Sequence, residues 1–457
     1  MKQIGKNPEA LDSSGRITKV RNMWKRTMRF LQGKHRLDKE LICVLKDKEL
    51  TNEQRMCKVK ELIYDGADPN AKTKKERSAL VLAANWNMRE IAEFLIQSGA
   101  DVNMRDGSGR NALMLACRKG HEGMAGLLLE HGAEIDAQNV RGWTALMLAA
   151  RKGKSRTVKM LINAGANLEA RNRDEETALL IAVGAGHFSS MCEIIEAGGD
   201  VNASYSKGRN ALLLAAERGD AECIRFLVEK VADIDARDKE GASPLAVLVG
   251  KGELELARLL VERGANVNQE DKEGASPLIR AVNSGLAEMA AFLLEKGAKS
   301  NKQDGARRTA LAICAKEGFV EIARIIIEYE KELAGKDVEF KPSVNIPQSY
   351  GQTPLMNAAH RGHAGMVELL AGNGADVDAS NEFKQTALHQ AVQEGQLEAA
   401  KALLEAGADA SMGNRYGMSA LEMAINKGNS EMRELLEAAQ GRIGEGTPNA
   451  ENQLRPN

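Results

Sequence analysis

The chain has 457 residues, in which 63 lysines and arginines nearly balance 64 acidic residues, and only 4% of the residues are aromatic. No stretch approaches the roughly 18 consecutive apolar residues of a membrane span, and the start of the chain lacks an apolar core of signal-peptide length. These features exclude an integral membrane protein and predict a cytoplasmic one, with a nuclear or secreted-effector destination as alternatives.

Residues 1–36 form a basic N-terminal segment, with ten lysines and arginines against two acidic residues. Ile17, Val20, Trp24, Met28 and Leu31 share one helical face, which predicts an amphipathic helix. We expect this helix to cap a repeat array, since a terminal repeat needs a partner for its exposed face. Two alternatives stay open. One is attachment to an anionic membrane or to a groove on a partner protein, and the other is a nuclear-import or nucleic-acid role.

One short segment then recurs eleven times, and each copy starts with a residue that favours a helix N-cap. Every step between these residues is 33 residues long, except for one step of 44. Residues 37–70 look like a degenerate first copy, so we expect about twelve helix pairs. The eleven N-cap residues are Ser78, Asn111, Thr144, Thr177, Asn210, Ser243, Ser276, Thr309, Thr353, Thr386 and Ser419.

Each copy predicts two short antiparallel helices and a projecting hairpin. Leu stands two residues after every cap, and Ala stands five residues after nine of the eleven, a pairing of large and small side chains that suits close helix stacking. Nine residues after the cap, Gly (Asn87 in the first copy) is expected to end the first helix in the left-handed conformation. Apolar residues at helical spacing, such as Val158 and Leu161, predict the second helix.

The chain resembles the ankyrin-repeat family, whose period is 33 residues, over residues 37–439. The resemblance implies an all-α ankyrin-repeat solenoid with projecting β-hairpin loops. It also implies a concave face, built from hairpin tips and first-helix ends, that binds proteins. The family's usual first-helix histidine is kept only at His389. The matching motifs are TPLM at Thr353, TALH at Thr386, Gly-His turns at His121, His187 and His363, and GADVN-like segments at Gly99 and Gly374.

The 44-residue step predicts an interruption of the array. We expect repeats over residues 37–333, an inserted loop over 334–350, and three further repeats over 351–439. Such insertions are usually tolerated surface loops, although long loops are also favoured places for function. Residues 440–457 are polar and rich in Gly, Pro and Asn, which predicts a disordered tail.

No catalytic, cofactor-binding or metal-binding site is expected. Most glycines and several histidines occupy turn positions of the repeat, and no nucleophile-base set, phosphate-cradling loop or metal-ligand cluster is visible. We therefore expect a non-enzymatic scaffold or adaptor. Reduced, small core residues are expected at all six cysteines, which lie in separate predicted helices: Cys43, Cys57, Cys117, Cys192, Cys223 and Cys314.

The predicted concave face of repeats one to five is basic, with 17 lysines and arginines against 7 acidic residues, whereas the sign reverses in repeats six and seven. Aromatic residues among these charges are typical of binding hot spots. We expect a monomeric protein that binds an acidic segment of a partner protein here. A solvated charged face, with aromatic rings that only brace neighbouring hairpins, is the alternative. The candidate partner-binding residues are Trp86, Arg105, Arg110, Arg118, Lys119, Arg141, Trp143, Arg151, Lys152, Arg173, Tyr205 and Arg209.

Overall fold

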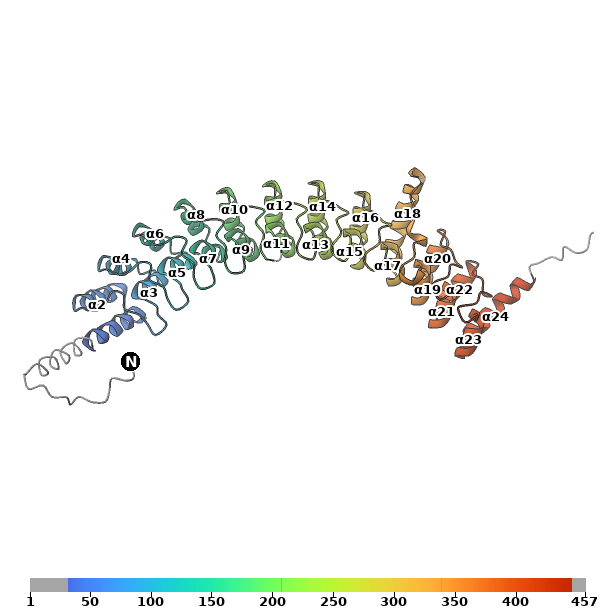
Figure 1. The fold of residues 1–457 in the computed structure, drawn as a ribbon, viewed down its shortest axis with the longest axis horizontal. Helices are drawn as coiled ribbons and strands as arrows, with labels where there is room; N and C mark the ends of the chain where they lie inside the picture. Colours follow the sequence, from blue (N-terminus) through green and yellow to red (C-terminus); the bar gives the residue numbers. More distant parts are fainter. Residues whose placement is uncertain (1–31, 207, 338, 446–457) are drawn as a thin grey trace, which may run out of the picture. The chain divides into compact units, whose positions relative to one another are not determined.

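The computed structural model describes residues 32–445, except for residues 207 and 338. The chain divides into two compact units, Met1–Ser206 and Lys207–Asn457. Within each unit the helices pair and stack in two layers (Figure 1). The amphipathic helix predicted before residue 32 lies outside the described residues.

The first unit begins with a helical segment whose described part covers residues 32–46. The first helices of its repeats stack on one another in one layer, and the second helices stack in the other. Its further helices are α2 (Asn52–Tyr64), α3 (Ala79–Asn85), α4 (Arg89–Gln97), α5 (Ala112–Lys119), α6 (Glu122–Glu130), α7 (Ala145–Arg151), α8 (Ser155–Asn163), α9 (Ala178–Ala185) and α10 (Phe188–Glu196).

The second unit continues the same pairing through its own repeats, and its last helix reaches Glu445, so residues 440–445 are helical where a disordered tail was predicted. Its helices are α11 (Ala211–Arg218), α12 (Ala221–Glu229), α13 (Pro244–Lys251), α14 (Leu254–Glu262), α15 (Pro277–Asn283), α16 (Ala287–Glu295), α17 (Ala310–Glu317), α18 (Val320–Lys336), the 3₁₀ turns η1 (Ser343–Asn345) and η2 (Ser349–Gly351), α19 (Pro354–Arg361), α20 (Ala364–Ala371), α21 (Ala387–Glu394), α22 (Leu397–Glu405), α23 (Ala420–Lys427) and α24 (Ser430–Glu445).

The predicted start and end of every first helix are confirmed. Each of the eleven cap residues accepts a hydrogen bond from the backbone N–H three residues later, as the free donors of a helix N-terminus require. The residue nine positions after each cap has a positive φ, between 63° and 81° for the glycines and 57° for Asn87. The first helices are therefore only about two turns long.

The repeated leucine and alanine form the core between the two layers. Ten of the eleven leucines are at most 2% exposed, and every alanine of the set is fully buried. Leu421, in the last repeat, is half-buried. The large and small side chains thus pack as the pattern predicts, and the packing loosens only at the last copy.

One side chain, five residues before the cap, shapes most of the loops. In the first unit, Oδ1 of Asp106 accepts hydrogen bonds from the backbone N–H groups of Ser108 (2.9 Å) and Arg110 (3.0 Å). Asn139 and Asn172 accept equivalent pairs in the next two loops. Over the residues described, the loops contain isolated bridges, as between Lys72 and Ser78, in place of continuous strands.

The inserted segment is held by a buried glutamate of the second unit. Helix α18 has 17 residues, and the side chain of Glu330 in its C-terminal half is 2% exposed. Its Oε2 accepts a hydrogen bond from the backbone N–H of Ser343 at 2.8 Å. Burial raises the pKa of Glu330, while hydrogen bonds from Ser300 and Ser343 act in the opposite direction.

The cysteines depart in part from the prediction. All six are free thiols, and Cys117, Cys223 and Cys314 are buried as expected. Cys43 and Cys57 are exposed, which corrects their prediction as core residues. Both lie in the degenerate first repeat, where the 33-residue pattern does not fix which helix face is buried.

Candidate protein-binding surface

Three arginines surround one buried carboxylate in the first unit. The side chain of Asp106 is 1% exposed, and its Oδ2 accepts hydrogen bonds from Nε and Nη2 of Arg110 at 3.1 and 2.8 Å. Nε of Arg77 lies 3.8 Å from the same oxygen. Burial lowers the pKa of Arg118, the charges of Arg110 and Arg77 lower it further, and the charge of Asp106 opposes this shift. Positive charge thus exceeds negative charge around Asp106.

The ionised form of Asp106 is stabilised by this arrangement. Burial opposes ionisation, but hydrogen bonds from the Arg110 side chain and from the backbone N–H groups of Arg110 and Ser108 outweigh it. The pKa of Asp106 is therefore held below its ordinary value. The carboxylate stays charged, so it fixes the loop and orients Arg110 at neutral pH.

The same positive charge recurs one repeat further on. Helices α5 and α7 pack against each other and carry Arg118-Lys119 and Arg151-Lys152 at equivalent positions. Neighbouring packed helices have axes about 8–10 Å apart. The two pairs therefore form adjacent rows of cations on the first unit. We call Arg77, Arg110, Arg118, Lys119, Arg151 and Lys152 the basic surface.

The buried ring of Trp143 packs beneath Arg151, one of the residues of the basic surface. Its side chain is only 8% exposed, and the guanidinium of Arg151 lies over its ring at 4.9 Å from the centroid. A cation above an indole face is attracted by the negative face of the ring. Trp143 therefore positions Arg151, and its contact with a partner stays a prediction.

Turn histidines tie the repeats together at the ends of the first helices. Nε2 of His121 lies 3.4 Å from the carbonyl oxygen of Asn85, and Nε2 of His187 lies 3.1 Å from that of Arg151. Burial lowers the pKa of His121, and the charges of Lys119 and Lys154 lower it further, while the contact with Asn85 opposes both. This imidazole is consequently neutral at pH 7 and responds to the positive field of the surface.

The other predicted partner-binding residues do not all join the basic surface. Trp86, at the end of α3, is 43% exposed. Arg105 instead ties two loops together, because it donates to the carbonyl oxygen of Gln138 at 2.9 Å and to Glu134 at 3.2 Å. Arg209 belongs to the second unit and pairs with Glu217 at 3.0 Å.

Arg141 and Arg173 are exposed at loop tips of the first unit, and Tyr205 is half-buried near its end. Backbone hydrogen bonds join these loop tips, for example from the N–H of Arg173 to the carbonyl oxygen of Arg141 at 3.1 Å. The two arginines therefore lie on neighbouring loops that are hydrogen-bonded to each other, where their charges can extend the positive field.

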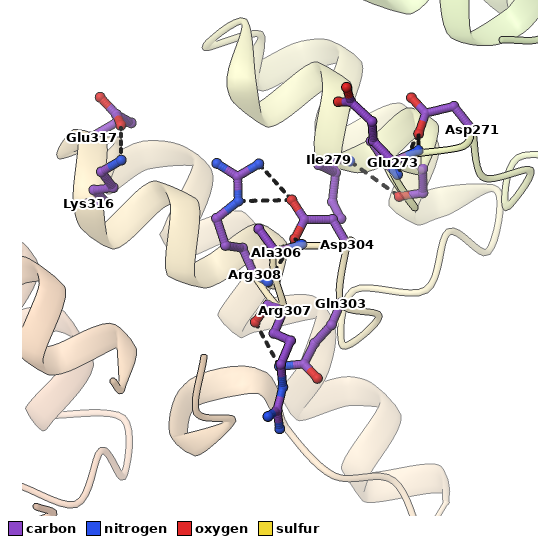
Figure 2. A network of polar contacts seen from close by, with 12 residues as sticks. Asp271, Glu273, Ile279, Gln303, Asp304, Ala306, Arg307, Arg308, Lys316 and Glu317 are labelled. Carbon is purple, nitrogen blue, oxygen red and sulfur yellow. Dashed lines mark hydrogen bonds and ion pairs between the residues drawn. The ribbon is translucent and has the colours of Figure 1, made fainter. Parts of the chain in front are cut away.

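The second unit contains ion pairs in the same kind of loop. Figure 2 shows Arg308 forming two hydrogen bonds, of 2.9 and 2.6 Å, with Oδ2 of Asp304. In the same view Lys316 pairs with Glu317 at 3.8 Å. Arg280 pairs with Asp271 in the preceding loop. The Arg308–Asp304 pair repeats the Arg110–Asp106 pair of the first unit at equivalent positions.

Within the described part of the chain, no group of three or more His, Cys, Asp or Glu side chains could hold a metal ion. None of the helices described is long and apolar enough to cross a membrane.

A family model described as ankyrin repeats (3 copies) matches residues 51–139, 132–205, 190–271, 212–304, 249–341, 278–381, 332–413 and 366–443. Among solved structures, the ankyrin repeat domain of Bcl-3, titled a unique member of the IkappaB protein family, matches with 30% identity and a TM-score of 0.44, over 48% of this chain and 99% of that one. No curated protein matches the sequence.

The matched segments together span most of the chain, and the fold is the helical solenoid that the repeats predict. Ankyrin repeats generally mediate protein-protein interaction, and the family is typically non-enzymatic. The chain belongs to the ankyrin-repeat family.

Proposed function

We propose that the first unit is an adaptor module that binds an acidic segment of a partner protein along the basic surface. The observation that supports this is the excess of cations over carboxylates there. Six side chains carry positive charge, and Asp106 is the carboxylate that pairs with two of them, Arg77 and Arg110. An approaching acidic segment would replace the missing negative charge.

The arrangement suits recognition because its parts are fixed before a partner arrives. Asp106 orients Arg110, and the ring of Trp143 holds Arg151. Preorganised side chains lose less conformational entropy on binding than free ones. The positive field would first increase the rate of encounter, and the guanidinium groups would then form paired hydrogen bonds with carboxylates. Trp86 is the exposed aromatic residue of this part of the unit that a partner could cover.

The test is binding of a fluorescent acidic peptide, rich in Glu, to the full chain. The variant replaces Arg118, Lys119, Arg151 and Lys152 with Gln together. We expect binding at least about tenfold weaker, because four charge contacts of a few tenths to one kcal/mol each are lost. The affinity of the unchanged protein should also fall as salt is added.

A charge-matched control replaces four exposed lysines of the second unit, Lys299, Lys331, Lys336 and Lys401, with Gln. It changes the net charge equally and should leave the affinity unchanged. Equal loss of binding in both variants would show attraction to net charge alone, and unchanged binding in the first variant would reject the proposed surface.

A further inference from the structure

A second feature of the first unit is a pocket beside its N-terminal helix. The segment 32–46 and the loop before α3 line an open pocket of about 660 Å³. Ile42 and Cys43 are its apolar lining, and lysines stand around it from both elements: Lys39 and Lys46 from the helix, Lys74 and Lys75 from the loop. Among the residues described, no acidic side chain lines it.

The pocket has a rigid frame. Arg55, in α2, is 6% exposed and donates hydrogen bonds to the carbonyl oxygens of Val44 (3.3 Å), Leu50 (3.0 Å) and Asp47. These bonds hold the C-terminal end of the segment 32–46. A pocket between two such fixed elements is formed before any ligand binds.

Arg77 connects this pocket to the basic surface. It lines the pocket, and it also lies 3.8 Å from Asp106 and contributes to the field at Arg118. The cations therefore continue from the pocket to the ends of α5 and α7. One extended ligand could contact both regions.

We propose that the pocket receives a large apolar side chain of the same acidic partner segment, which rests on the function proposed above. Acidic residues on either side of the apolar side chain would meet the surrounding lysines, while Ile42 and Cys43 would take the side chain out of water. Interfaces commonly place buried hot-spot side chains near their centre, inside a polar rim. Because Trp143 is buried, we expect the apolar anchor of the interface to come from the partner.

Charge complementarity selects this occupant over others. Residues 1–31 carry eight lysines and arginines against two acidic residues, so they would be repelled by the lysines around the pocket. Single-stranded nucleic acid binds by stacking its bases on aromatic side chains, and no Phe, Tyr or Trp is among the residues that line the pocket. An acidic peptide with one apolar residue satisfies both the charge and the cavity.

The thiol of Cys43 gives a direct readout of the pocket. Two peptides of the same acidic composition are compared, one with a central Leu and one with Ser at that position. We expect the Leu peptide to bind about tenfold more tightly, as burial of a leucine side chain predicts. It should also slow alkylation of Cys43 by a maleimide. Alkylation of Cys57, exposed on the neighbouring helix α2, is the internal control and should not change.

Each other outcome has a definite meaning. Equal affinity for both peptides, or binding of the Leu peptide without protection of Cys43, overturns the pocket proposal and leaves the basic surface intact. Binding of neither peptide rejects both proposals. If alkylation of Cys43 without peptide speeds up in a full chain with Trp24→Ser and Met28→Ser, the chain's own N-terminal segment fills the pocket, and the proposal is wrong.

A second experiment tests the pocket by peptide affinity alone, without a measured alkylation rate. In a Cys57→Ser background, prior attachment of a bulky maleimide to Cys43 fills the pocket. We expect the tenfold preference for the Leu peptide to disappear while the affinity for the Ser peptide is kept. Attachment to Cys57 in a Cys43→Ser background should preserve the preference, and a preference that survives blocking at Cys43 contradicts the proposal.

Discussion

In the first unit, α5 and α7 end in Arg118-Lys119 and Arg151-Lys152, whereas α15 and α17 of the second unit end in Asn283 and in the paired Lys316 and Glu317. The backbone that presents these residues is the same in both units. Each first helix has a capped start, a left-handed stop and about two turns between them. Charge is therefore free to vary on a fixed scaffold, and it differs between these helices where the fold does not.

The second unit has a pocket in which side-chain amides form hydrogen bonds with one another. Its cavity of about 400 Å³ beside α19 and α21 is lined largely by side-chain amides. Gln352 and Gln390 exchange two hydrogen bonds, of 2.7 and 2.9 Å, and Asn381 donates a third to Gln352 at 3.2 Å. These groups satisfy one another, whereas the lysines and arginines of the first unit outnumber their carboxylates.

The largest predicted effect concerns the support of the basic surface. Trp143→Ala should lower the free energy of unfolding by about 3 kcal/mol, because a large buried aromatic side chain leaves a cavity. Arg151 would also lose the ring beneath it. Chemical denaturation measures the loss, and it should appear in the transition of the first unit.

Trp86→Ala is the matched control. This side chain is 43% exposed, so we expect a change within about 0.5 kcal/mol in stability. Any effect should be on partner binding. A large stability loss at Trp86 together with none at Trp143 would contradict the assigned roles of the two rings.

Two substitutions of Asp106 distinguish its role in loop stability from its role in the charge of the surface. Asp106→Ala removes the acceptor of two backbone N–H groups and of Arg110, and should cost about 2 kcal/mol. Asp106→Asn keeps an Oδ1 acceptor, as Asn139 does naturally, and should cost about 1 kcal/mol. Because the carboxylate is lost, Asp106→Asn should nevertheless bind the acidic peptide more tightly.

Asp304→Asn provides the comparison in the second unit, where Arg308 and the same kind of loop are present. We expect a similar loss of stability, measured by denaturation, and no change in peptide affinity. Tighter binding in both variants would mean that net charge, and not the location of the charge, controls recognition.

A smaller effect is visible in the pH dependence of stability. The pKa of Asp106 is lowered, so its contribution is present above the ordinary value of 3.8 and is lost as the pH falls through the folded value. Burial raises the pKa of Glu330, so its contribution is present below the ordinary value of 4.5 and is lost as the pH rises through the folded value. The two buried carboxyl groups thus act with opposite signs.

Glu330→Gln should remove the second effect. Its amide oxygen can still accept the hydrogen bond from the backbone of Ser343, and no ionisation is left to oppose burial. We expect stability relative to the unchanged protein to increase as the pH rises from 4.5 toward neutrality, measured by denaturation at a series of pH values. A constant difference across that range would show that Glu330 does not ionise differently on folding.

Most of the helices could be predicted from the sequence because the same pattern of residues recurs eleven times. The cap residues, the glycine stops and the core leucines each serve one local requirement, so their spacing alone fixes the helices. The loop carboxylate was harder to recognise. Asp106 counts as one acidic residue in composition, although the recurrence of Asp or Asn five residues before the cap, as at Asn139 and Asp304, was an available signal.

The pocket and the role of Trp143 could not be predicted in this way. Both depend on which face a side chain presents, and one copy of a repeat does not reveal that. Lys39, Cys43 and Lys46 lie three or four residues apart on one helix, a spacing equally compatible with a solvated face. Only the loop that packs opposite them, with Lys74 and Lys75, turns that face into a cavity.

The smallest expected difference between the units is in the pKa values of two histidines, one in each unit. Burial lowers the pKa of both His121 and His389. For His121, the charges of Lys119 and Lys154 lower it further, whereas the other influences on His389 are hydrogen bonds with the backbone of Met418 and Met412, which oppose the shift. Added salt screens charges over about 10 Å at 0.1 M and does not alter burial.

We therefore expect salt to raise the pKa of His121 and to leave that of His389 unchanged, with NMR titration of the ring protons as the measurement. Lys119→Gln should raise the pKa of His121 in the same direction, and so should binding of the acidic peptide, because each reduces the positive potential at the ring. By linkage, the peptide should then bind more tightly as the pH falls below the ordinary histidine value of 6.5, toward the lowered pKa of His121. If salt moves both histidines equally, the field of the basic surface does not reach its own turn, and a partner would have no reason to prefer the first unit.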